Sequence, residues 1–127
     1  ILYSKHTDQK ITNKDVLIID QYGLLKKIYS YSKITYIGGG FDKGIHNTLE
    51  AAIYKNFIIF GPIYKDFPEA TDLINEKIGF PITNDNQLKT KITELARISQ
   101  NQHLDTQISA FFKKRQVNLN LIIKEIV

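Results

Sequence analysis

Residues 34–61 read ITYIGGGFDKGIHNTLEAAIYKNFIIFG. Two short apolar runs, at 34–37 and 57–60, are rich in β-branched and aromatic residues and are typical of strands buried on both faces of a sheet. Residues 46–54, between them, place apolar side chains three or four positions apart, and this spacing predicts a helix. A strand, a helix and a second strand make a βαβ unit with parallel strands and a right-handed crossover. This stretch therefore predicts an α/β fold.

The same alternation continues on both sides of this unit. Further strands are predicted at 1–4, 15–20 and 79–82, and further helices at 23–31, 66–77, 84–99 and 104–127, the last with a break near Asn118. Pro81 has no N–H to donate, so the strand at 79–82 is expected at an edge of the sheet. Asn84 or Asp85 is expected to cap the helix that follows. The predicted architecture is a Rossmann-like parallel sheet flanked by helices.

The composition fits one globular domain, residues 1–127. The chain is 43% hydrophobic and 24% charged, and it has no cysteine, which excludes disulfides, thiolate zinc sites and cysteine nucleophiles. The net charge of +4 comes almost entirely from lysine. No stripe of arginine and aromatic residues points to nucleic acid as a partner. The chain contains no methionine and opens inside an apparent strand, so we expect it to be part of a longer protein.

Two loops are candidates for a binding site, because ligands of open α/β sheets bind at the carboxyl ends of the strands. The first covers residues 20–24 and the second residues 38–50. The second opens with Gly38, Gly39 and Gly40, which let the backbone approach an anionic ligand such as a phosphate. The pattern matches neither the dinucleotide fingerprint nor the P-loop. A tight turn from strand to helix explains it nearly as well.

Polar side chains crowd the start of the helix after the glycines. Glu50 could accept hydrogen bonds from a vicinal diol, with Asn47 and Thr48 as further ligand contacts. The alternative is a capping box, in which Asn47 is the N-cap and Glu50 follows three residues later. The spacing alone leaves both interpretations open.

Other polar residues near these loops also have a functional and a plain interpretation. We interpret Asp20 as a loop cap rather than a ligand contact. Lys43 and Lys65 could neutralise a phosphate or simply face solvent. His46 has no second histidine at ligand spacing, so no metal site is expected.

Three segments in a fixed order resemble the 3-deoxy-D-manno-octulosonic acid (Kdo) transferases. They are GGGF at 38–41, GIHNTLE at 44–50 and FGPIYKDFPEA at 60–70. The resemblance runs from residue 1 to at least residue 82, and the chain is most similar to members from Bacteroidetes. Members of this family transfer Kdo from CMP-Kdo to lipid A precursors in lipopolysaccharide biosynthesis. They have two Rossmann-like domains of the GT-B type, and this chain resembles the C-terminal half, which binds the donor.

The resemblance implies a donor site but no catalytic residue in this chain. The residues that it places at CMP-Kdo are Tyr22, Gly23, Leu24, Gly38, Gly39, Gly40, Asn47, Thr48, Leu49 and Glu50, with Glu50 at the ribose hydroxyls. A further CMP-contacting segment of the family would precede residue 1. The catalytic base, the site for the lipid A acceptor and the membrane-associating surface are expected in an N-terminal domain. No cofactor and no metal are expected, and the whole enzyme is expected at the cytoplasmic face of the bacterial inner membrane.

The sequence departs from the family pattern in two places. Thr48 stands where many members have proline, and residues 55–57 read Lys-Asn-Phe where many have Gly-x-Pro. The last helix of GT-B enzymes often crosses back to the N-terminal domain. We therefore expect partial exposure of its apolar residues Phe111, Phe112, Leu121 and Ile122.

Other functions stay open at this point. One is a GT-B transferase that uses a UDP-sugar as donor. A second is a Rossmann-like binding module without catalytic activity, and a more distant one is a nucleic-acid binder, whose affinity would fall steeply with salt.

Overall fold

The computed structural model describes residues 1–5, 14–98 and 102–126, with side chains described at 104–116 of the last segment. Three strands form the sheet, in the order β1-β2-β3. They are β1 (Ile34–Ile37), β2 (Phe57–Phe60) and β3 (Gly79–Pro81). Both pairs are parallel, with Ile34 opposite Phe57 and Ile58 opposite Gly79. The predicted parallel sheet is confirmed, and Pro81 lies in an edge strand as expected.

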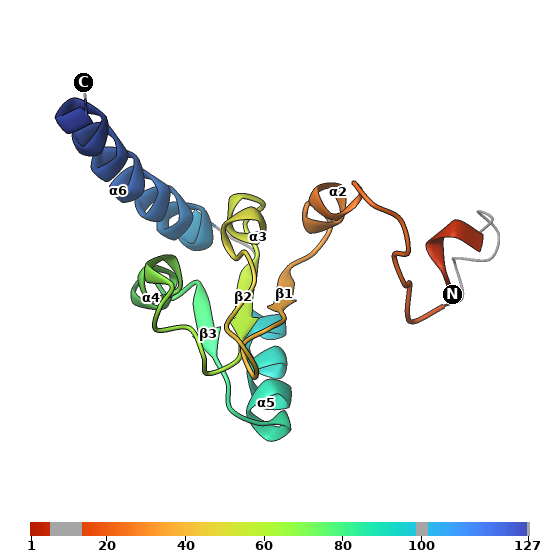
Figure 1. Ribbon diagram of the computed structural model, residues 1–127. Coiled ribbons are helices and arrows are strands. Elements are labelled where there is room, and N and C mark those ends of the chain that lie inside the picture. Colours follow the sequence, from red (N-terminus) through yellow and green to blue (C-terminus); the bar gives the residue numbers. More distant parts are fainter. Residues whose placement is uncertain (6–13, 99–101, 127) are drawn as a thin grey trace.

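Helices connect the strands and cover both faces of the sheet. α3 (Leu49–Ile53) joins β1 to β2, and α4 (Pro68–Asn75) joins β2 to β3. α5 (Asp85–Arg97) follows β3 and lies on the face opposite to α3 (Figure 1). α2 (Leu25–Tyr29) precedes β1 and packs on α3. A 3-10 turn, η1 (Tyr3–Lys5), begins the chain and the long helix α6 (Gln102–Ile126) ends the described part. This arrangement confirms the Rossmann-like α/β architecture.

The hydrophobic core surrounds β2, the central strand. All four residues of β2 are buried, which explains why its sequence is apolar without alternation. Helices on both faces of the sheet supply the other large part of the core. Their buried side chains are Ala51 and Ala52 from α3, Ala70 and Leu73 from α4, Leu95 from α5, and Leu104, Ile108 and Phe111 from α6.

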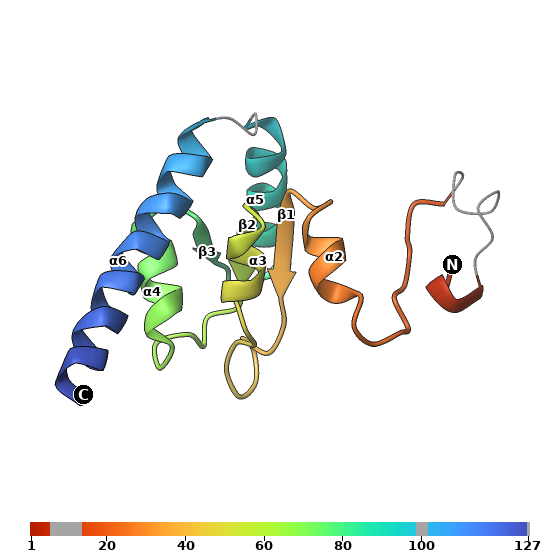
Figure 2. The same cartoon turned by 90° about the horizontal axis from the view of Figure 1, so that it is seen from above.

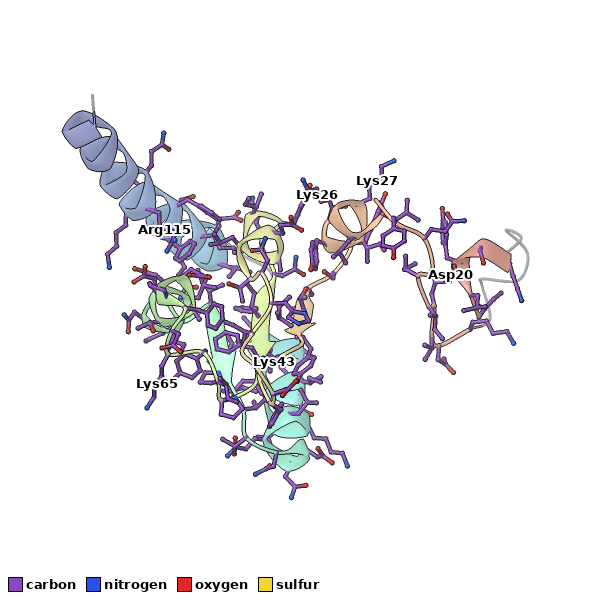
Figure 3. The ribbon with its side chains drawn as sticks, viewed as in Figure 1. Asp20, Lys26, Lys27, Lys43, Lys65 and Arg115 are labelled. Carbon is purple, nitrogen blue, oxygen red and sulfur yellow. The ribbon has the colours of Figure 1, made fainter. Side chains whose placement is uncertain are left out.

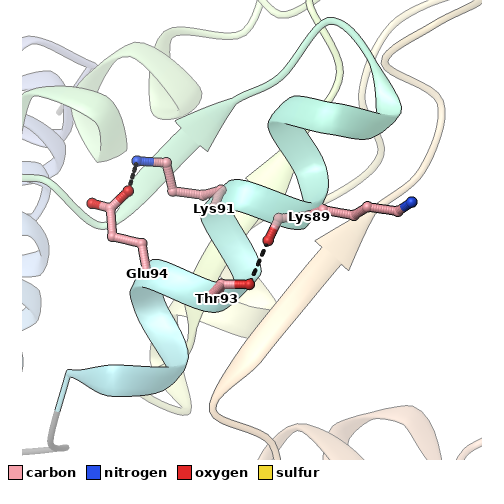
Figure 4. A network of polar contacts seen from close by, with 4 residues as sticks. All are labelled: Lys89, Lys91, Thr93 and Glu94. Carbon is pink, nitrogen blue, oxygen red and sulfur yellow. Dashed lines mark hydrogen bonds and ion pairs between the residues drawn. The ribbon is translucent and has the colours of Figure 1, made fainter.

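A side-chain hydrogen bond satisfies a backbone group at each end of α5. The Asn84 side chain accepts a hydrogen bond from the Gln87 N–H at 2.9 Å, which confirms the predicted N-cap. At the other end, Lys33 Nζ donates to the carbonyl of Ala96 at 2.9 Å. Figure 4 shows two contacts along this helix: Lys91 pairs with Glu94 at 2.8 Å, and Thr93 donates to the Lys89 carbonyl at 2.9 Å. Such exposed contacts stabilise a helix only slightly.

α3 and α4 end in the same way, with a lysine in the left-handed region. φ is +62° at Lys55 and +58° at Lys77. After α4, the Ile78 N–H donates to the Leu73 carbonyl and the Lys77 N–H donates to the Ile74 carbonyl, both at 2.9 Å. This pattern is a Schellman motif, and its left-handed position usually holds glycine.

The predicted strand at 15–20 is wrong. Ile18 makes a single parallel bridge with Leu2, and these two residues lie outside the three-stranded sheet. Val16, Leu17 and Ile18 are 64%, 41% and 53% exposed, so the run is not buried on two faces. Within the described residues no strand pairs with it along its length, and this is why its apolar pattern does not produce a buried strand. The predicted strand at 1–4 is likewise reduced to the Leu2 bridge and η1.

α6 differs from its prediction in two respects. It continues through Asn118 without a break. Phe111 is only 1% exposed and belongs to the core, so its predicted exposure is wrong, whereas Phe112 is half-buried. Leu121 and Ile122 lie outside the residues whose side chains are described. In the part of the chain that the structure describes, no helix combines the length and the apolar character needed to cross a membrane.

Candidate functional site

The loops that leave β1 and β2 contact each other through their backbones. A Cβ added to Gly40 would lie 2.6 Å from the Gly61 nitrogen, and one added to Gly61 would lie 2.5 Å from the Gly40 carbonyl carbon. The Ile63 N–H also donates to the Gly40 carbonyl at 2.9 Å. Real Cβ atoms do not approach backbone so closely, so glycine at these two positions lets the loops meet. The carboxyl ends of two adjacent strands thus form one joined edge.

The glycine-rich loop is also closed on itself. The Gly39 carbonyl accepts hydrogen bonds from the N–H groups of Asp42 and Gly44, both at 3.1 Å. φ is +88° at Gly39 and +126° at Gly44, values that L side chains rarely adopt. The His46 N–H donates back to the Gly38 carbonyl at 3.0 Å. The tight-turn interpretation of the glycines is therefore confirmed, and a ligand contact by the same loop stays a prediction.

The two polar residues before α3 have different surroundings: one side chain binds a backbone N–H of the helix start, and the other is buried. Asn47 Oδ1 accepts from the Leu49 N–H at 2.9 Å, so this side chain supports the helix start from the position before the N-cap. The predicted capping box, with Asn47 as the N-cap, is therefore wrong. Thr48 occupies the N-cap position without a side-chain capping bond. It is fully buried, and within the described residues its hydroxyl has no hydrogen-bond partner. α3 begins three residues later than predicted, at Leu49.

Glu50 lies in the first turn of α3 and is half-buried. Burial and the nearby negative charge of Glu50 both raise the pKa of the Tyr29 hydroxyl. Glu50 therefore lies close to α2, the helix that packs on α3. A carboxylate accepts hydrogen bonds and donates none when it is ionised, so this position suits the hydroxyl groups of a ligand.

The segment before α2 supplies the third group of predicted site residues. Tyr22 is fully exposed, Gly23 has a φ of +83° and Leu24 is half-buried. A pocket of about 580 Å³ lies against this segment and is lined by Tyr22, Gly23, Leu25 and their neighbours. Asp20 accepts hydrogen bonds from the N–H of Ser4, at 2.9 Å, and from its hydroxyl, and these bonds lower the pKa of the carboxyl group. The loop-cap interpretation of Asp20 is confirmed.

The predicted site residues come from three segments at one end of the sheet. Figure 2 shows the loop after β1 and the start of α2 at the end toward which the β1 arrow points. Lys43 and Lys65 are both exposed and come from the loops after β1 and β2 (Figure 3). In the described part of the chain, no three His, Asp or Glu side chains group closely enough to hold a metal ion.

Asn56 is a positioning residue that sequence reasoning missed. It is fully buried, and its Nδ2 donates to the carbonyls of Tyr29 at 2.9 Å and Ala51 at 3.2 Å. The Ser32 hydroxyl donates to its Oδ1. Asn56 thereby ties the end of α2, the middle of α3 and the start of β2 together, at the end of the sheet opposite the candidate site. The only signal in the sequence is an asparagine directly before an apolar strand.

A second pocket, of about 340 Å³, lies at the opposite end of the strands. Its lining includes Lys33 and Lys55, whose ammonium groups already bind the Ala96 carbonyl and the Asp105 carboxylate, each at 2.9 Å. Because these charges are paired within the protein, we assign the candidate site to the carboxyl end.

No protein-family model matches the chain. It is 36% identical over 100 residues to the 3-deoxy-D-manno-octulosonic acid transferase of Rickettsia conorii, and 34% identical over 88 residues to the enzyme of that name from Aquifex aeolicus. These matches cover 78% and 68% of this chain. The chain belongs to the Kdo transferase family. The likeness to its Bacteroidetes members stays a prediction.

Two further comparisons place this sequence within longer relatives. It is 30% identical over 98% of its length to a bifunctional glycosyltransferase/methyltransferase of Fusobacterium nucleatum. Its fold matches the crystal structure of the C-terminal CMP-Kdo binding domain of WaaA from Acinetobacter baumannii with a TM-score of 0.62, at 21% identity. The match covers 77% of this chain and 51% of that domain. The matched stretches make up 20% to 25% of the length of the three curated relatives named here, so the chain spans only part of these proteins.

Proposed function

We propose that this chain is the donor-binding part of a glycosyltransferase that moves Kdo from CMP-Kdo to a lipid A precursor. One observation carries the proposal: the chain is 36% identical to a Kdo transferase over 78% of its length. The fold agrees with it, since a domain described as CMP-Kdo binding has the same architecture. The acceptor, the place of action at the cytoplasmic face of the inner membrane, and the absence of a cofactor are parts of this proposal.

The proposed donor site joins the three segments at the carboxyl end of the sheet. Glu50 would accept hydrogen bonds from the ribose hydroxyls of CMP, for which its half-buried carboxylate is suited. The other proposed contacts are Tyr22, Gly23, Leu24, Gly38, Gly39, Gly40, Asn47, Thr48 and Leu49. The joined loops after β1 and β2 keep the backbone near the donor free of side chains at Gly40 and Gly61.

The chemistry of the transfer explains what such a site has to supply. An acceptor hydroxyl attacks the anomeric carbon C2 of Kdo, and the bond between C2 and the phosphate-linked oxygen breaks. The electrons of that bond leave with CMP, whose phosphate gains negative charge. Fixed N–H groups and nearby cations stabilise charge that develops in this way. Lys43 and Lys65 are exposed cations in the loops at this end and are candidates for that role. The base that takes the acceptor proton lies, in this proposal, in the N-terminal domain.

The proposal is tested by calorimetric titration with CMP, with UMP as the control nucleotide. We expect CMP to bind more tightly than UMP, and Glu50→Ala to weaken CMP binding at least tenfold, because a hydrogen bond to a charged group contributes about 1.5–3 kcal/mol. The matched control is Glu69→Ala, since Glu69 lies in the first turn of α4 and is also half-buried. It should leave CMP binding unchanged.

The titration is run on residues 1–127 and on the whole polypeptide that the gene encodes, because a further CMP-contacting segment would precede residue 1. Preference for UMP over CMP would favour a UDP-sugar donor. Failure of both nucleotides to bind the whole polypeptide would favour a non-catalytic binding module. Either result would overturn the proposal.

A further inference from the structure

Tyr29 is a buried side chain with a polar group that the proposed donor site does not use. The residue is only 7% exposed and belongs to the hydrophobic core. Its backbone is held in place, because Asn56 Nδ2 donates to the Tyr29 carbonyl at 2.9 Å and to the Ala51 carbonyl at 3.2 Å. Within the described residues the Tyr29 hydroxyl makes no hydrogen bond. The phenol is therefore a fixed group with an unused donor.

α2 and α3 run in the same direction and begin at the same end of the sheet. α2 ends shortly before β1 starts, and α3 starts after β1 ends, so both helices start at the carboxyl end of the strands. Figure 1 shows the two helices on one side of the sheet, and they pack on each other. Long side chains in helices point back toward the helix start. Tyr29, the last residue of α2, therefore directs its phenol toward the end where the candidate site lies.

Glu50 lies on the face of α3 that Tyr29 contacts. The Tyr29 ring packs against the Tyr54 ring, with the ring centroids 6.4 Å apart. Glu50 comes four residues before Tyr54, so their side chains share one helix face, a turn apart. Burial and then the negative charge of Glu50 raise the pKa of the Tyr29 hydroxyl. Because the influence of a charge weakens with distance, this hydroxyl lies near the Glu50 carboxylate.

A carboxylate that binds ribose gains from being held in one orientation. A glutamate side chain has several rotatable bonds, and ordering them on binding costs affinity. An ionised carboxylate has two oxygens with about four acceptor positions. It can therefore accept a hydrogen bond from a neighbouring phenol and still accept hydrogen bonds from two ribose hydroxyls.

We propose that Tyr29 is a positioning residue of the donor site: its hydroxyl donates to one oxygen of Glu50 and holds the carboxylate toward the ribose of the nucleotide. Rotation of the half-buried Glu50 side chain brings the two groups into hydrogen-bond contact as the ribose binds. Such bonds are often long before a ligand is present and tighten in the complex. This inference rests on the proposed function, because it takes Glu50 as the ribose ligand.

Nucleotide titration of the whole polypeptide that the gene encodes tests the proposal. Tyr29→Phe keeps the ring and removes only the hydroxyl. We expect it to weaken CMP binding about three- to tenfold, the loss that one hydrogen bond accounts for. Binding of dideoxyCMP, which lacks both ribose hydroxyls, should not change. The matched control is Tyr54→Phe, which removes the hydroxyl of the other ring of the pair and should alter neither affinity.

The link between Tyr29 and Glu50 is tested in two further ways. In a Glu50→Ala background, Tyr29→Phe should have no additional effect on CMP binding, because the group through which it acts is gone. Without any nucleotide, NMR of the tyrosine rings follows the pKa of Tyr29, whose signal is the one lost in Tyr29→Phe. This pKa should fall in Glu50→Gln, which removes the negative charge that raises it, and should not change in Glu69→Gln.

The outcomes separate this proposal from the proposed function. If the whole polypeptide binds no CMP, the proposed function fails and this inference fails with it. If CMP binds, but Tyr29→Phe weakens CMP and dideoxyCMP equally or weakens neither, the proposed function stands and Tyr29 serves packing alone. A pKa of Tyr29 that stays the same in Glu50→Gln would also overturn the proposal, because the hydroxyl would then lie too far from the carboxylate.

Discussion

Thr48 is a residue of the candidate site whose buried hydroxyl group lacks a hydrogen-bond partner within the described residues. The residue is fully buried. A buried polar group without a partner costs about 1–3 kcal/mol of stability.

Replacing Thr48 by valine tests that cost. Valine keeps the shape of threonine and removes only the hydroxyl, and Thr48 makes no capping bond that would be lost. We expect Thr48→Val to raise the free energy of unfolding by about 1 kcal/mol in urea titrations of the ligand-free protein. Asn47→Ala is the matched control, since it removes the bond to the Leu49 N–H and should lower stability by about 0.5–1 kcal/mol. A loss of stability in Thr48→Val would show that the hydroxyl has a partner.

Asn56 shows why part of the buried polar structure could not be predicted at this scale. Its sequence neighbours indicate only a turn before a strand, which is how asparagine commonly occurs. Its function depends on carbonyls at Tyr29 and Ala51, which belong to two different helices. Only the tertiary fold brings those carbonyls together. By contrast, the bond from Leu49 to Asn47 is local, and for that reason the sequence could predict a helix-starting role for Asn47.

Among the elements, the end of α4 carries a conformational cost. Lys77 holds the left-handed position of the Schellman motif with a φ of +58°. A residue with a Cβ pays about 1–2 kcal/mol in this region, whereas glycine does not. We expect Lys77→Gly to raise the free energy of unfolding by about 1 kcal/mol, after allowance for the greater freedom of glycine in the unfolded chain.

Lys77→Ala separates the backbone effect from the loss of charge. It removes the ammonium group but keeps the Cβ, so the midpoint of chemical unfolding should stay near that of the parent protein. An equal gain in both variants would assign the effect to charge. Lys77 is better suited to this test than Lys55, because Lys55 also pairs with Asp105 at 2.9 Å.

The strands show what an apolar pattern can and cannot predict. The runs at 34–37 and 57–60 form strands with the predicted bounds, because each has a parallel neighbour to pair with. The run at 15–20 has a similar composition, but only Ile18 pairs, through its bridge to Leu2. An apolar sequence pattern indicates that a segment can form a strand, but whether it does so depends on a neighbouring strand with which it can pair. The same limit applies to α3. The helical spacing of apolar residues predicted a helix over 46–54, but only Leu49–Ile53 is helical.

At the scale of the whole molecule, α6 is the element whose role differs most from its prediction. Leu104, Ile108 and Phe111 are buried and lie on one stripe of the helix. Arg115 pairs with Asp72 of α4 at 3.2 Å, and the Gln107 side chain donates to the Glu76 carbonyl at 2.7 Å. This helix therefore closes the core of the domain over the residues where its side chains are described.

Phe111 tests that role, because its side chain is 1% exposed within the core. Truncation of a buried phenylalanine costs about 3–5 kcal/mol, a large part of the 5–15 kcal/mol that stabilises an ordinary domain. We expect Phe111→Ala to lower the free energy of unfolding by that amount in chemical denaturation followed by circular dichroism. Phe112→Ala is the matched control, since its ring is half-buried beside Phe111 at a centroid distance of 5.0 Å. It should cost less than half as much. If both variants were equally mild, α6 would not belong to this core, and its apolar stripe would serve another part of the protein.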